Sequence, residues 1–189
     1  MTNYYCLVTG LPELSLEDGK LSYTVANFKT EIYPELSKAD KKLVDLFYLK
    51  FDNRNLLTLL KDKEASVDTS LGNYSADELL SVIASIKEET APDKKFPAYF
   101  YEFAELYLNT PDEERWGLED KLHGFYYNHA MKSGNPFVSA WFELNLDVNN
   151  ILAAMTARKY KMEVAKVPVG ENLVAEALRS SNARDFGLA

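Results

Sequence analysis

The sequence predicts an all-α fold of tandem, duplicated helical-bundle subdomains with long motif-bearing helices and a short extended N-terminal lead-in. Three observations support this. Apolar residues recur at helical spacing through most of the 189 residues. Proline, glycine and capping residues divide these stretches into segments of helical length. One polar motif occurs twice with similar surroundings, which is typical of a duplicated unit.

The repeated motif has the form Asp-x-x-Asn-(Leu/Ile)-Leu. Its first copy contains Asp52 and Asn55, and its second contains Asp147 and Asn150, 95 positions later (147 minus 52). Residues three apart share a helix face. Apolar residues surround both copies, and an unpaired buried polar group costs ~1–3 kcal/mol. We therefore expect each pair to hold its helix against a neighbouring helix or loop; alternatively, the two aspartates are ordinary N-caps.

The chain begins with an apolar, β-prone segment, residues 3–11, that Pro12 ends. No second strand stands nearby, so we expect an extended or short helical lead-in packed on the body. Ser22 can cap a helix to about residue 33, which Pro34 ends.

The first long helix is expected over residues 37–63 and carries the first motif. A turn at Gly72 follows. Ser75 and Glu78 then have the spacing of a capping box, which predicts a helix over 75–89.

Aromatic residues at helical spacing predict a helix over 95–108, and acidic residues after Pro111 favour a helix start there, continuing to about 131. Asn135 followed by proline is an N-cap signal for the second long helix, 136–161. We expect residues 164–170 to be extended.

The last helix is expected over 171–181. We divide the chain into a first helical subdomain (1–92), a second (93–168) and the start of an incomplete third unit (169–189). Only 19 residues follow Gly170 in the chain of 189. We therefore expect either a fragment or a vestigial last unit.

Composition excludes several classes of function. A formal net charge of −8 disfavours a nucleic-acid partner, which requires a basic surface. The single cysteine, Cys6, cannot form an internal disulfide and fits a reducing compartment. We find no signal peptide, no apolar run of about 18 residues and no phosphate-binding Gly-x-x-x-x-Gly-Lys-(Ser/Thr) motif.

A long helix with Asp-x-x-Asn-(Leu/Ile) and a nearby basic residue, repeated in tandem, resembles the central-stalk adaptor of V-type and archaeal-type rotary ATPases, which is named C in those machines and d in its eukaryotic form. The opening Tyr-Tyr-Cys-Leu-Val-Thr-Gly-Leu-Pro-Glu-Leu, residues 4–14, is similar to a bacterial family, mostly from Bacteroidetes, that is related to this adaptor. Lys61 and Lys63 follow the first motif, whereas Thr156 and Arg158 stand at the matching places in the second.

The resemblance implies a non-catalytic adaptor that couples the soluble rotor shaft to the membrane ring that translocates ions. The expected partners are the proteins of the rotor shaft and of the ring, and the expected location is cytoplasmic, peripheral on the inner membrane. No cofactor, nucleotide or other small-molecule ligand is expected. The alternative is a free-standing α-helical adaptor or regulatory protein.

A third possibility is a metal-dependent hydrolase that uses Glu119, His123 and His129. Two histidines and a carboxylate can hold zinc or iron. Glu119 and His123 share a helix face, but His129 lies six residues further, turned by about 120° at about 100° per residue. The competing interpretation is two ordinary surface or half-buried histidines.

Overall fold

The computed structural model describes residues 4–13, 15, 17, 19, 23–181, 183 and 185–187. In this part of the chain the regular secondary structure is helical throughout, with no strand. The predicted all-α class is therefore confirmed. Within the same residues, no helix combines the length and apolar character needed to cross a bilayer.

The helices follow one another along the chain and are joined by loops and short helical turns. Their bounds are α1 (Tyr5–Thr9), α2 (Val25–Asn27), α3 (Lys38–Lys61), α4 (Ala76–Lys87), α5 (Ala98–Asn109), α6 (Leu118–Met131), α7 (Pro136–Lys159) and α8 (Leu173–Ser180). A π-helical turn (Phe28–Ile32) and a 3₁₀ turn (Tyr33–Glu35) join α2 to α3, and 3₁₀ turns also occur at Asp112–Gly117 and Val164–Lys166.

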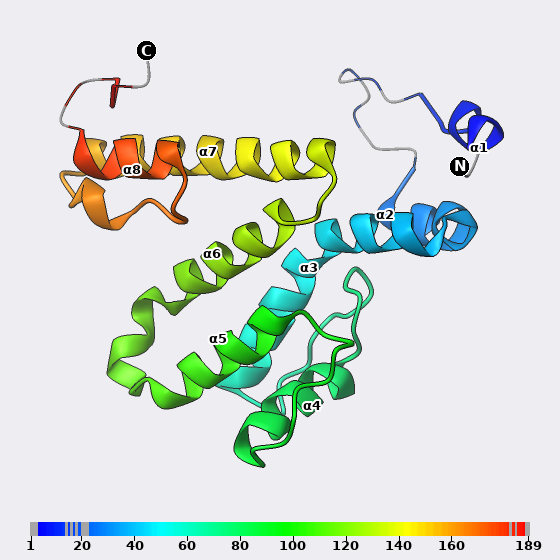
Figure 1. The fold of residues 1–189 in the computed structure, drawn as a ribbon, viewed down its shortest axis with the longest axis horizontal. Coiled ribbons are helices and arrows are strands. Elements are labelled where there is room, and N and C mark those ends of the chain that lie inside the picture. Colours follow the sequence, from blue (N-terminus) through cyan, green and yellow to red (C-terminus); the bar gives the residue numbers. More distant parts are fainter. Residues whose placement is uncertain are drawn as a thin grey trace.

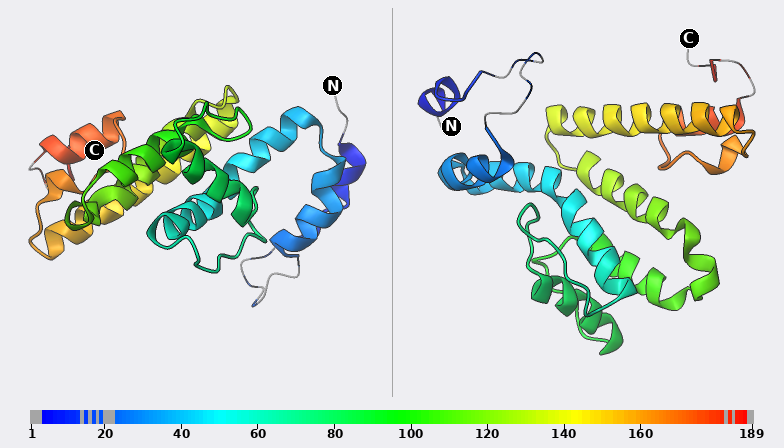
Figure 2. Two further views of the ribbon diagram at one scale, coloured as in Figure 1. Left: turned by 90° about the horizontal axis from the view of Figure 1, so that it is seen from below. Right: turned by 180° about the vertical axis from the view of Figure 1, so that it is seen from behind.

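Helix α6 occupies the centre of the molecule (Figure 1). It packs on α7 on one side and on α3 and α5 on the other, while α4 covers α3 and α5. Helix α8 lies beside the C-terminal part of α7. The two other views show the same arrangement, with α1 outside the bundle (Figure 2). Both motif-bearing helices are therefore long rods at the two sides of α6.

One continuous hydrophobic core joins α3, α4, α5 and α6 to the first half of α7. Its fully buried members include Leu56, Leu79, Phe100 and Phe103, and it extends to Phe142. A smaller cluster around Ala154, Leu178 and Phe186 lies between α7 and α8. The division at residues 92 and 168 stays a prediction, but residue 92 does not separate two cores, because α4 and α5 share one.

Local capping signals place several helix starts correctly. Ser37 accepts the backbone N–H of Asp40 at the start of α3. The predicted capping box at Ser75 and Glu78 is present in α4. Asn135 accepts the N–H of Val138 at the start of α7. The caps expected at Ser75 and at Asn135 are confirmed, and the helix expected from residue 37 begins directly after Ser37. A cap depends only on residues within one helical turn.

The N-terminal lead-in, expected to be extended or a short helix, contains the helical turn α1, whose residues are not buried. Tyr4 ties it to α3 by donating its hydroxyl to Asp40 at 2.7 Å. The proposed cap Ser22 lies outside the described residues; the capping box found is that of Thr24 and Asn27. Residues 164–170, expected to be extended, begin with a 3₁₀ turn.

Candidate functional site

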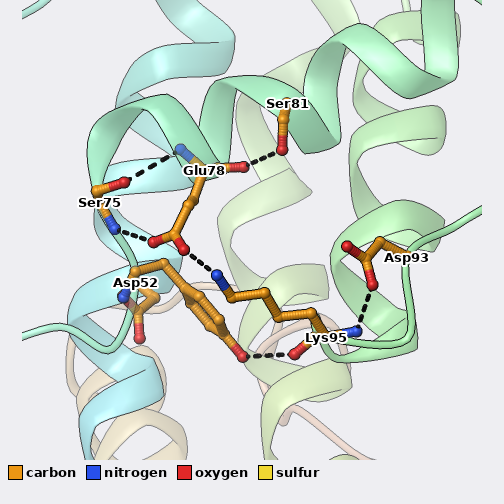
Figure 3. Close-up of polar contacts among 7 residues, drawn as sticks. Asp52, Ser75, Glu78, Ser81, Asp93 and Lys95 are labelled. Carbon is orange, nitrogen blue, oxygen red and sulfur yellow. Dashed lines mark hydrogen bonds and ion pairs between the residues drawn. The ribbon is translucent and has the colours of Figure 1, made fainter.

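Asp52 lies in the interior of α3 and is fully buried. Its carboxylate accepts hydrogen bonds from the backbone N–H of Asn73, at 2.9 and 3.0 Å, and from that of Tyr74 at 3.1 Å. Figure 3 shows Asp52 close to Ser75, the N-cap of α4. The carboxylate thereby fixes the start of α4 against the middle of α3.

The start of α4 is also attached to the segment before α5. Glu78 accepts the N–H of Ser75 at 2.7 Å and forms an ion pair with Lys95 (Figure 3). Tyr74 donates its hydroxyl to the carbonyl of Lys95 at 3.1 Å. Polar contacts therefore connect α3, α4 and α5 at one point.

Gly72 and Lys29 keep the loop between α3 and α4 close to Asp52. Gly72 passes so near that a Cβ there would overlap the Oδ1 atom of Asp52. Lys29 donates from Nζ to the carbonyl oxygens of Leu71, at 2.9 Å, and of Gly72, at 2.5 Å. Burial lowers the pKa of Lys29, and the nearby carboxylates of Asp52 and Asp45 act in the opposite direction.

Asn55 holds the earlier part of the same loop. It is buried, and its Nδ2 donates to the carbonyl of Asp68 at 2.9 Å. At the other end of the loop, Nδ2 of Asn73 donates to the carbonyl of Asp45 at 3.0 Å. The α3–α4 loop is thus bonded to α3 at several points along its length.

The second pair lies in the interior of α7 and contacts the segment that leads to α8. Asn150 is buried and bonds twice to the backbone of Val169: its Oδ1 accepts the N–H and its Nδ2 donates to the carbonyl, both at 2.8 Å. Oδ1 of Asp147 accepts Nδ2 of Asn172 at 2.7 Å, and Asn172 is the N-cap of α8.

A cation also closes the second loop. Arg179, on α8, donates from Nη2 to the carbonyl oxygens of Pro168 and Gly170, both at 2.7 Å. Its place corresponds to that of Lys29 over the first loop, although the two cations come from different sides of their motifs. In both halves, therefore, an Asp-Asn pair and a cation hold the loop that follows a long helix.

The N-cap interpretation of Asp52 and Asp147 is wrong, because both lie well inside their helices. The cations that contact the loops, Lys29 and Arg179, are not the basic residues that follow the motifs in the sequence. Lys61 and Lys63 are exposed at the end of α3 and beyond it, whereas Lys29 makes the contact. Nothing in the spacing around Lys29 marks it, since its partners lie more than forty positions away.

The burial of Asp52 predicts a pH effect on stability. Burial raises its pKa from 3.8 to about 6, although the N–H groups of Asn73 and Tyr74 and the charge of Lys29 favour the carboxylate. Between these two values the folded state binds more protons than the unfolded state. Stability from this group is therefore highest at low pH and is lost as the pH rises through 6, by about 3 kcal/mol in total.

Comparison with Asp52→Asn isolates this contribution from those of other carboxyl groups. We expect the free energy of unfolding of the wild type, minus that of the variant, to fall by about 2 kcal/mol between pH 4 and pH 7, the part of the total that lies in this range. Urea unfolding followed by circular dichroism measures it. A difference that is constant across this range would show that folding does not raise the pKa of Asp52.

The metal-site alternative is not supported by the geometry. Glu119 and His123 are exposed, whereas His129 is half-buried with its ring 5.3 Å from that of Tyr99. Burial, together with the charge of Lys132, lowers the pKa of His129. Among the described residues, no three His, Cys, Asp or Glu side chains come close enough to hold a metal ion. The three residues are therefore not one site.

Helix α7 has an exposed apolar face opposite its buried one. The buried face contains Val138, Phe142 and Leu146. The exposed face, which we call the α7 ridge, consists of six side chains that are 46–72% exposed: Phe137, Trp141, Leu144, Val148, Leu152 and Met155. They follow one another at three or four residues and span about 27 Å at 1.5 Å per residue. Such a face is typical of a helix that packs against another protein.

A family model described as Protein of unknown function (DUF2764) matches residues 1–189 of the chain. No curated protein and no solved structure matches the chain. The description of the family names no activity, substrate or partner.

Proposed function

The chain belongs to the family described as Protein of unknown function (DUF2764), and we propose that it is a non-catalytic adaptor of a V/A-type rotary ATPase. In this proposal it joins the soluble rotor shaft to the membrane ring that translocates ions. The support comes from the all-helical fold, from the resemblance of the two Asp-x-x-Asn helices to the central-stalk adaptor of these machines, and above all from the α7 ridge.

The α7 ridge suits contact with a helix of the rotor shaft. It runs along a helix of 24 residues, so that it forms a straight edge rather than a pocket. Between Phe137 and Met155 the only charged residues are Glu143 and Asp147, and neither belongs to the ridge. A partner helix would cover the ridge along its length, as in other helix-to-helix interfaces.

The hydrogen bonds that hold the α3–α4 loop and the α7–α8 segment suit the transmission of torque. A load on α7 reaches α8 through the contacts of Asn150 and Arg179, and a load on α3 reaches α4 through Asp52. Because these contacts are buried or charge-assisted, the loops resist displacement better than a solvated connection would. Transmission of force through these contacts needs no nucleotide and no chemical reaction.

Affinity capture from the native host tests this proposal. We expect the tagged chain to recover the rotor-shaft and catalytic proteins of the ATPase, and Leu144→Asp on the α7 ridge to reduce that recovery at least tenfold. Asn128→Asp is the matched control, because it adds one carboxylate at an exposed position of α6. It should leave recovery unchanged.

Repeated absence of ATPase proteins under gentle conditions, with both variants folded, would contradict the proposal. Recovery of other proteins that Leu144→Asp abolishes would indicate the free-standing adaptor instead. Equal recovery by Leu144→Asp and Asn128→Asp would show that the ridge is not the contact.

A further inference from the structure

A cleft of about 750 Å³ opens between α3, α6, α7 and the segment before α8. Its volume lies within the usual range for small-molecule sites, about 300–1,000 Å³. Aromatic side chains form much of its wall: Phe47, Tyr126, Tyr127, Trp141 and Phe142. Because its walls come from segments far apart in the sequence, no local pattern in the chain indicates that it exists.

Asn53 lines this cleft and is 3% exposed. Its Oδ1 accepts the hydroxyl of Tyr99 at 2.7 Å, and this bond sets the orientation of the amide. Its Nδ2 is buried and has no hydrogen-bond partner among the described residues. A buried donor without a partner costs about 1–3 kcal/mol, and a ligand in the cleft that accepts from it would offset this cost.

Lys50 lines the same cleft and is exposed. It lies three residues before Asn53 on α3, so that both side chains share one face of the helix. A carboxylate at this wall can therefore accept from the amide of Asn53 and face the ammonium of Lys50. Asp120 and His123 line the cleft on α6. The carboxylate of Asp120 would repel a negatively charged ligand group on that side of the cleft.

We propose that this cleft binds a small aromatic carboxylate. Its carboxylate accepts a hydrogen bond from Nδ2 of Asn53 and faces Lys50, while its ring lies among Tyr126, Tyr127 and Trp141. This site is separate from the α7 ridge except at Trp141, and it does not depend on the adaptor function. Occupation would fill the space between α3 and α7.

Titration of the full chain with 1-naphthoate, followed by nuclear magnetic resonance, tests the proposal. We expect saturable shifts that include the side-chain NH₂ signals of Asn53, identified by their loss in Asn53→Asp. The cationic probe 1-naphthylmethylammonium should bind at least tenfold more weakly. Lys50→Gln should raise the Kd for 1-naphthoate about fivefold to tenfold, as expected for loss of a charge-assisted contact.

A second variant fills the cleft without touching either polar group. Ala153 lines the cleft and is half-buried, so that Ala153→Phe should abolish binding of 1-naphthoate. The proposal is overturned if 1-naphthoate causes no saturable shift up to its solubility limit, or if both probes bind equally. Unchanged binding in Lys50→Gln also overturns it. These readouts need no other protein of the ATPase, so that their failure is distinct from failure of the adaptor proposal.

Discussion

Gly72→Ala is expected to lower the free energy of unfolding by about 3 kcal/mol, the upper range for forcing an atom into a packed site. The added Cβ would overlap Oδ1 of Asp52. That carboxylate cannot move aside without breaking its bonds to the N–H groups of Asn73 and Tyr74. If the loop moves instead, Lys29 loses its contact with the carbonyl of Gly72.

Urea unfolding at pH 7, followed by circular dichroism, measures this loss. Gly117→Ala is the matched control, because a Cβ at Gly117 meets no atom within 4 Å. It should change the free energy of unfolding by less than about 0.5 kcal/mol, as is usual for substitutions away from tightly packed sites. Equal midpoints for the two variants would show that the α3–α4 loop can adjust around Asp52 at little cost.

Asn150→Leu is expected to cost about 3 kcal/mol, because it leaves buried polar groups without partners. Leucine is close to asparagine in size but cannot bond to the N–H and the carbonyl of Val169, which Asn150 holds at 2.8 Å each. The segment before α8 would then lose its attachment to α7, and α8 would retain the contacts of Asp147 and Arg179.

Asn149→Leu makes the same chemical change at the neighbouring, exposed position, where the amide has one bond, to the hydroxyl of Tyr127. We expect it to lower the melting temperature by at most a third as much as Asn150→Leu. Calorimetry of both variants gives the comparison. A similar loss in the two would show that the contact with Val169 does not set the effect.

Gly72→Ala and Asn150→Leu together test whether the two halves of the molecule hold their loops in the same way. The first half uses a carboxylate on main-chain N–H groups, with Asn55 on the carbonyl of Asp68. In the second half, the amide of Asn150 bonds to the backbone of Val169, and Asp147 accepts from the side chain of Asn172. A duplicated unit would keep the position of the contact in both halves while the groups that form it changed. We therefore expect large losses of stability at both sites.

The helical class, the two long rods and most helix ends follow from the order of residues alone. Apolar period, caps and proline act within about one or two helical turns, so that all the interacting residues are neighbours along the chain. The motif residues Asp52, Asn55, Asp147 and Asn150 are also recognisable there, because polar residues inside apolar helices must find partners.

What those residues touch depends on how the helices pack. Lys29 and Arg179 over the loops, the closeness of Gly72 to Asp52, and the cleft at Asn53 all join segments that are distant along the chain. The same holds for the shared core across residue 92 and for the α7 ridge, since periodicity shows that a helix is apolar on two sides but not which side is covered. Local signals set the elements, whereas packing sets their partners, because contact energy depends on distance in space and not on separation in sequence.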